Sequence, residues 1–281
     1  MNANTAVQQL QIPAIDAIKA KHKATWEDGD YASFARYMED GAIEILGNWN
    51  IKPGKNMLDV GCGSGQSAIP AAKNGIKVTG VDIAENLIEH ARERAQKEHL
   101  TARFDVGDAE ALPCANENFD VVISMIGAMF APRPEKVVNE FARVLKPGGQ
   151  LYMANWTQTS MPAQMFKCVS GIMPPPPDFI PPVLWGDEET VNQRLSDNFT
   201  DIQLTRKNYP QWHYPFNTTE LVQLFRTHFG PVKQAFDLAD NTQQATLHQN
   251  LETIYRSNSE VKNSILTITG GEYLEVIATR R

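Results

Sequence analysis

A glycine-rich turn between an apolar strand and a helix constrains the fold more than any other feature of this sequence. Residues 56–60 predict a buried strand, and Gly61, Gly63 and Gly65 alternate directly after it. Glycine adopts backbone angles that other residues disfavour, and it lets a ligand approach the main chain closely. A strand that runs through such a turn into a helix is typical of open α/β sheets, which bind ligands at the carboxyl ends of their strands.

Strand and helix patterns alternate along the chain after this turn. Residues 119–125 form a nearly continuous apolar run, as expected for a strand with two buried faces. The other predicted elements are strands at 77–82, 102–106, 150–156 and 273–278 and helices at 84–98 and 134–145, with a short helix that ends near Gly75. We expect Pro70 to bend that short helix or to loosen one of its turns. The alternation predicts an α/β fold with a doubly wound, mostly parallel sheet.

Composition and pattern divide the chain into four stretches. They are an N-terminal helical lid (1–50), a ligand-binding core (51–156), a cap insertion (157–200), and strands and helices that complete the sheet (201–281). The cap insertion is predicted from methionines and four consecutive prolines at 174–177, in a connection too long for an ordinary loop. Asn217 and Glu220 have the spacing of a capping box at the start of a helix.

The composition argues against several classes of function. A net charge of -7 gives no overall attraction to nucleic acid, so we expect no such partner. Cys62, Cys114 and Cys168 are widely spaced, which argues against a metal site or a disulfide framework and favours a reducing cytoplasm. No apolar run reaches the roughly 18 residues of a membrane-spanning helix, and the first residues lack the pattern of a signal peptide.

The glycine spacing also bears on the choice of cofactor. A dinucleotide fingerprint would require a third glycine at position 66, where this chain has Gln66. Asp82, at the end of the second predicted strand, could accept hydrogen bonds from both hydroxyls of a ribose. That carboxylate fits a nicotinamide dinucleotide and S-adenosylmethionine equally well, so the glycine spacing decides against the dinucleotide.

Five segments in order resemble the class I S-adenosylmethionine-dependent methyltransferases, especially the small-molecule enzymes related to the ubiquinone and menaquinone C-methyltransferases. The segments read MLDVGCGSG, VTGVD, FDVGDAEALP, ENFDVVIS and RVLKPGG, and they span about residues 55–156. The resemblance implies a Rossmann-like sheet of seven strands, mostly parallel, with an antiparallel last strand at 273–278. It also implies S-adenosyl-L-methionine as the cofactor and S-adenosyl-L-homocysteine as its product.

The resemblance carries cofactor roles over to individual positions. Asp59, Gly61 and Gly63, with the small turn residue Cys62 between the glycines, would shape the pocket for the methionine portion. Asp82 would bind the ribose. The remaining positions are Ile83 against adenine, Asp108 and the backbone of Ala109 at the adenine amino group, and Ser124 and Met125 below the methyl group.

The methyl acceptor is constrained only by exclusion. Enzymes that methylate amino groups of DNA bases carry an Asp/Asn-Pro-Pro-aromatic run after the fourth strand, whereas residues 124–130 of this chain are apolar. We therefore expect a small, partly apolar acceptor that is methylated at oxygen or carbon rather than nitrogen. Four aromatic residues are expected to form a lid over it: Trp26, Tyr31, Tyr37 and Trp185. His213, flanked by aromatic residues, is the leading candidate for a general base, and His22 is the weaker one.

Two other functions remain open at this stage. The chain could bind S-adenosylmethionine without transferring its methyl group, for example as a partner of another subunit. It could also be an NAD(P)-dependent oxidoreductase, which the residue at position 66 disfavours.

Overall fold

The computed structural model of the chain describes residues 3–176 and 179–281. Residues 1–2 of the expected lid and residues 177–178 of the expected cap insertion lie outside the described residues. None of the described helices combines the length and apolarity that are needed to cross a bilayer.

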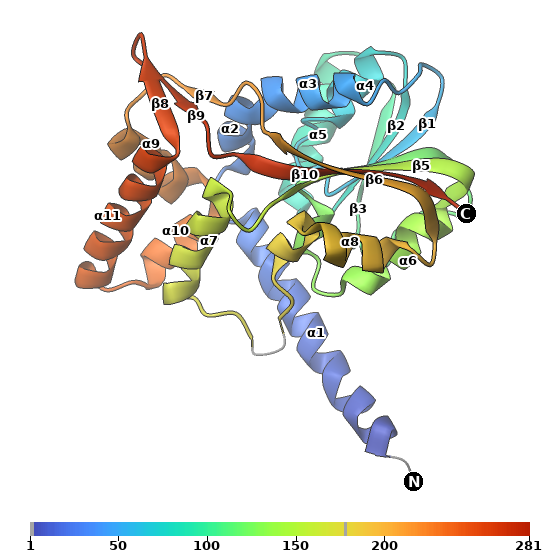
Figure 1. The fold of residues 1–281 in the computed structure, drawn as a ribbon, viewed down its shortest axis with the longest axis horizontal. Helices are drawn as coiled ribbons and strands as arrows, with labels where there is room; N and C mark the ends of the chain where they lie inside the picture. The colour runs from blue at the N-terminus through green and yellow to red at the C-terminus, as the bar shows by residue number, and fades with distance from the viewer. Residues whose placement is uncertain (1–2, 177–178) are drawn as a thin grey trace.

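A seven-stranded sheet forms the centre of the molecule, in the order β3-β2-β1-β4-β5-β10-β6 (Figure 1). The strands are β1 (Asn56–Val60), β2 (Lys77–Asp82), β3 (Ala102–Val106), β4 (Phe119–Met125), β5 (Leu145–Trp156), β6 (Phe199–Asn208) and β10 (Glu272–Arg280). Strands β1 to β5 pair in parallel, and β10 runs antiparallel to both β5 and β6. The doubly wound sheet with an antiparallel last strand is therefore confirmed.

Helices cover both faces of this sheet (Figure 1). They are α3 (Glu39–Asn48), α4 (Ala68–Lys73) and α5 (Glu85–Lys97) on one face, and α6 (Pro134–Val144) and α8 (Glu188–Leu195) on the other. Helix α6 buries Val137, Val138 and Phe141 against the sheet, as its sequence pattern indicates. The bend expected at Pro70 is wrong, because α4 begins only two residues earlier and the proline lies in its first turn, where no intrahelical N–H is required.

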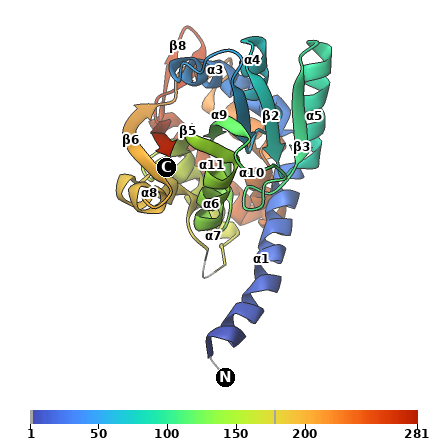
Figure 2. The ribbon, with the colours of Figure 1, turned by 90° about the vertical axis from the view of Figure 1, so that its right-hand side faces the viewer.

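A cap of helices stands over one end of the sheet. It comprises α1 (Ala3–Glu27), α2 (Tyr31–Ala35), the 3-10 turn η1 (Arg36–Met38), α7 (Met161–Ile172), α9 (Thr218–His228), α10 (Gly230–Leu238) and α11 (Asn241–Ser257). A small antiparallel sheet of β7 (His213–Tyr214), β9 (Ile265–Ile268) and β8 (Ser259–Lys262) adjoins these helices. Figure 2 shows that the N-terminal end of α1 projects from the body of the molecule.

The division of the C-terminal half differs from the expected one. Three cap helices, α9, α10 and α11, come from the chain between β6 and β10, and helix α7 packs against α10 and α11. Two later parts of the expected cap insertion pack elsewhere, because the 3-10 turn η3 (Pro182–Gly186) lies against β5 and α8 lies against α6 and β6. The capping box of Asn217 and Glu220 is present at the start of α9.

Candidate functional site

The glycine turn after β1 requires glycine for conformation and for contact. Gly61, Gly63 and Gly65 have φ angles of 73°, 53° and 88°, in the left-handed region that favours glycine. A Cβ atom at Gly61 would lie 2.6 Å from the Cα atom of Gly127, which follows β4. The two backbones therefore touch, and this contact brings the ends of β1 and β4 to one place.

The turn after β4 is itself unusual. Ile126 has a φ of 55°, and its N–H donates to the carbonyl oxygen of Ala154 on β5 at 2.8 Å. The hydroxyl of Ser124 donates to the carbonyl oxygen of Val60 at 2.8 Å and accepts from the N–H of Ala128 at 2.9 Å. Ser124 is buried and supports this turn through these two hydrogen bonds. Contrary to its expected cofactor role, it does not line the pocket.

A pocket with an empty volume of about 1450 Å³, including its open mouth, lies over these turns. Nine of the ten residues with an expected cofactor role line it: Asp59, Gly61, Cys62, Gly63, Asp82, Ile83, Asp108, Ala109 and Met125. They come together because the parallel strands β1 to β4 all end at this edge of the sheet. Trp26 and Tyr31 of the expected lid line the same pocket.

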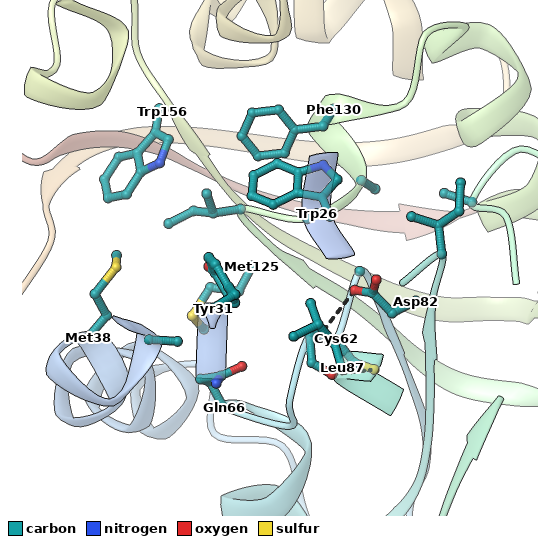
Figure 3. A pocket seen from close by; sticks show the side chains of 18 of the residues that line it. Trp26, Tyr31, Met38, Cys62, Gln66, Asp82, Leu87, Met125, Phe130 and Trp156 are labelled. Atoms are coloured by element: carbon teal, nitrogen blue, oxygen red, sulfur yellow. Dashed lines mark hydrogen bonds between the residues drawn. The ribbon is translucent and has the colours of Figure 1, made fainter. Parts of the chain in front are cut away.

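Two carboxylates line this pocket close enough to interact, the buried Asp59 and the half-buried Asp82. The backbone N–H groups of Gly63 and Ala84 each donate to Asp82 at 2.9 Å, and Figure 3 marks one of these two hydrogen bonds with a dashed line. Burial raises the pKa of Asp82, and these hydrogen bonds partly offset the rise. Burial and the nearby charge of Asp82 raise the pKa of Asp59 to about 8. The Oδ2 atom of Asp59 has no hydrogen-bond partner among the described residues, so an ammonium group in the pocket would satisfy it.

The raised pKa of Asp59 predicts that this residue's contribution to the stability of the cofactor-free protein is lost as the pH rises. The native state binds a proton that the unfolded state releases near pH 4, so the contribution of Asp59 to the free energy of unfolding should fall between about pH 4 and about pH 8. The upper limit of this slope is about 1.4 kcal/mol per pH unit. Urea unfolding at several pH values measures it, and Asp59→Asn should flatten it. Equal slopes for the two proteins would refute the assignment.

A cluster of four charged residues lies beside this pocket. The Nζ atom of Lys19 on α1 lies 2.5 Å from Asp108 and 2.6 Å from Glu110. Glu110 has a fully buried carboxylate, which also binds the Arg133 guanidinium at 2.7 Å. The cluster holds α1 against the loop that follows β3. Among the described residues that line the pocket, Lys19 is the only lysine or arginine, and its charge is already paired.

The other end of the pocket is an aromatic wall (Figure 3). Its members are Trp26, Tyr31, Phe34, Phe130, Trp156, Phe166, Tyr209, Trp212, Phe225 and Phe229. The rings contact one another, as in the pairs of Trp26 with Phe130 and of Trp156 with Trp212, whose centroids are 5.0 and 5.6 Å apart. Met38, Met161 and Met165 complete this apolar surface. Pockets of this kind bind flat, apolar molecules.

Two residues of the expected lid lie outside the pocket lining. The ring of Tyr37 packs against Tyr214 of the small sheet, with centroids 5.0 Å apart. Trp185 is buried in η3, where the guanidinium of Arg194 lies 4.7 Å from its ring centroid. The placement expected for Trp185 is wrong, because η3 turns back across the end of β5. A Cβ at Gly186 would lie 2.3 Å from the carbonyl oxygen of Trp156.

His213 is also outside the pocket lining. It lies on β7 of the small sheet with an exposed side chain, and its ring nitrogens are 2.9 Å from Thr267 Oγ1 and 3.2 Å from Gln211 Oε1. Strand alternation explains this placement. The buried neighbours Trp212 and Tyr214 face the core, so the residue between them faces solvent. We therefore do not retain His213 as a base, whereas His22 on α1 lines the pocket.

Several pocket residues carried no recognisable signal in the sequence. Phe225 and Phe229 in and after α9 are spaced like ordinary core residues of a helix, and nothing local links them to the glycine turn. Lys19 has no motif around it. Trp156 could have been found, because it ends β5 at the edge of the sheet where ligands bind.

Comparison with known proteins finds a family model and relatives that are similar to this chain. A family model described as a methyltransferase domain matches residues 58–153. An uncharacterized protein of Mycobacterium tuberculosis is 34% identical over 228 residues, which are 80% of this chain and 82% of that protein. The 27-O-demethylrifamycin SV methyltransferase of Amycolatopsis mediterranei is 33% identical over 145 residues, which are 50% of this chain and 53% of that enzyme.

The fold is also similar to solved structures. The phosphoethanolamine N-methyltransferase 2 of Haemonchus contortus, determined in complex with S-adenosyl-L-methionine, superimposes with a TM-score of 0.56 at 21% identity. The match covers 86% of this chain and 52% of that one. At this level of identity the likeness concerns the fold alone.

Proposed function

Because this chain belongs to the class I methyltransferases that use S-adenosyl-L-methionine, we propose that it methylates a small, partly apolar acceptor at oxygen or carbon. The aromatic wall is the observation that carries the choice of acceptor. A carboxylate or phosphate on the acceptor would find no unpaired lysine or arginine among the described lining residues. The relative named for a 27-O-demethylated rifamycin supports an oxygen acceptor.

The residues of the pocket fit the cofactor that we place there. The unpartnered Oδ2 atom of Asp59 suits the ammonium group of a methionine moiety, and the carboxylate of Asp82 retains lone pairs for two ribose hydroxyls. We place adenine near Ile83, Asp108 and Ala109, and we place the reacting end of the cofactor above Met125. The bound cofactor supplies an already activated methyl group.

The protein itself contributes alignment and exclusion of water. Methyl transfer is an in-line displacement, so its rate depends on how closely the acceptor atom is held on the line of attack. Trp26 and Tyr31 from the N-terminal elements close one side of the pocket, and Phe229 lies 5.8 Å from Trp26 between ring centroids. The wall thus removes water and orients a flat acceptor.

The free thiols of the three cysteines support our further proposal that the enzyme works in a reducing cytoplasm.

Thermal unfolding with added cofactors tests this function. We expect S-adenosyl-L-methionine and S-adenosyl-L-homocysteine to raise the melting temperature, while NAD and NADP leave it unchanged. A ligand at 100 times its dissociation constant stabilises the native state by about 2.7 kcal/mol. Transfer of a radiolabelled methyl group to a panel of hydroxylated aromatic compounds then separates an enzyme from a protein that only binds the cofactor. Stabilisation by NADP alone would refute the proposal.

A further inference from the structure

One face of helix α1 lines part of the pocket. Lys19, His22 and Trp26 all line it, and their spacing of three and four residues places them on the same side of the helix. An α-helix rises 1.5 Å per residue, so His22 lies about 4.5 Å along the axis from Lys19 and about 6 Å from Trp26. Each of the two flanking residues marks a different end of the pocket.

Lys19 marks the end where we place adenine, and Trp26 marks the aromatic wall. The ammonium of Lys19 binds Asp108 and Glu110, whereas the ring of Trp26 packs against Phe130 and Tyr31 with centroids 5.0 and 5.8 Å away. His22 lines the pocket between these two residues of the helix, and so between the Lys19 ion pairs and the ring of Trp26. A group that exchanges a proton with the acceptor has to lie within reach of the acceptor atom.

The surroundings of His22 favour an uncharged imidazole. Its ring meets the ring of Phe179 edge to face at 5.6 Å. Burial lowers the pKa of His22, and the charge of Lys21 lowers it further. The carboxylate of Glu110 and the backbone of Phe130 act in the opposite direction with smaller effect. Glu110 is itself neutralised by Lys19 and Arg133, and Asp108 by Lys19. A neutral imidazole at neutral pH can accept a proton.

We propose that His22 is the general base of this methyltransferase and that the acceptor is a flat, uncharged molecule with an acidic hydroxyl group, either phenolic or enolic. This inference rests on the proposed function. A base is useful only for an acceptor whose reacting atom carries a proton. An amine can react through a free lone pair, and a carboxylate would need an unpaired cation, whereas Lys19 of the described lining is already paired with Asp108 and Glu110.

The reaction balances with this single base. The hydroxyl proton of the acceptor passes to a ring nitrogen of His22 as the acceptor oxygen forms its bond to the methyl carbon. The bond between that carbon and sulfur breaks, and its electron pair stays on sulfur, which turns the sulfonium into a neutral thioether. The imidazolium then releases its proton to solvent. General bases of this kind contribute about 100-fold to 10,000-fold in rate.

The test uses the full-length protein saturated with S-adenosyl-L-homocysteine and 4-nitrophenol as the probe, because its visible absorption reports ionisation. Calorimetry first measures binding of S-adenosyl-L-homocysteine to the wild-type protein. We expect bound 4-nitrophenol to ionise at a lower pH than free 4-nitrophenol, and His22→Gln should abolish this shift. His213→Gln removes an exposed imidazole outside the pocket lining and is the matched control, which should retain the full shift.

A second measurement needs no variant. In the ¹⁵N-histidine NMR spectrum of the wild-type complex, the His22 imidazole should become charged when 4-nitrophenol binds.

Methyl transfer from S-adenosyl-L-methionine to 4-nitrophenol should also fall about 100-fold or more in His22→Gln at neutral pH. If the probe fails to bind, or ionises equally in wild type and His22→Gln, the inference is overturned. If the wild-type protein does not bind S-adenosyl-L-homocysteine, the proposed function is refuted instead.

Discussion

Gly61→Ala is expected to lower the free energy of unfolding by about 2–5 kcal/mol. The φ angle of 73° at Gly61 costs a residue with a Cβ about 1–2 kcal/mol. The new Cβ would also lie 2.6 Å from a backbone atom of Gly127, and such an overlap in a packed interior costs about 1–3 kcal/mol more. Urea unfolding monitored by tryptophan fluorescence measures the change.

Gly148→Ala separates the two contributions. Gly148 has a nearly equal φ of 76°, but a Cβ there would meet no atom within 4 Å. This variant should lose only the conformational part, about 1–2 kcal/mol. If both variants lose the same free energy of unfolding, the contact between Gly61 and Gly127 does not contribute to stability.

Asp82→Ala is expected to weaken binding of S-adenosyl-L-homocysteine by at least about 1.5 kcal/mol, or roughly tenfold in the dissociation constant. The carboxylate that we place on the ribose hydroxyls is oriented by the N–H groups of Gly63 and Ala84, so its loss also loosens the glycine turn. Isothermal calorimetry measures the dissociation constant. Circular dichroism checks that the variant is folded.

Glu85→Ala is the matched control for this experiment. Glu85 follows Asp82 by three residues, and its side chain is mostly exposed and outside the pocket lining. Its 3.7 Å ion pair with Lys23 is a surface contact of small energy. Affinity should therefore stay within about twofold of wild type for this variant. An unchanged affinity in Asp82→Ala would show that the ribose is held by other residues.

The cofactor end of the pocket could be predicted because its positions are local in the sequence. Asp59 is the last residue but one of β1, Asp82 ends β2, and Asp108 follows β3 by two residues, and parallel strands that end at one edge of a sheet must bring such residues together. Gln66 disfavoured a dinucleotide, which agrees with the methyltransferase domain model that matches residues 58–153. These inferences need only the period of the strands and the direction of the sheet.

The choice between the two histidines could not be made in that way. His213 has aromatic neighbours in sequence, but on a strand those neighbours face the opposite side, and the histidine itself is exposed. His22 has no comparable neighbours, yet helix α1 carries it into the pocket. Contacts with residues distant in the sequence decide which way a short strand or a cap helix faces. The local pattern therefore did not show whether His213 or His22 points into the pocket.

The sequence by itself determined the sheet, the glycine turn and the kind of cofactor, because these depend on repeating local patterns and on backbone angles that only glycine adopts easily. The tertiary structure alone decided the aromatic end of the pocket, where we propose that the acceptor binds. Its aromatic wall draws residues from α1, α2, β5, α7 and α9, which are far apart in the chain. An apolar residue in a cap helix has the same pattern whether it faces the core or a ligand, so only the packing of α1 and α9 over the sheet distinguishes the two.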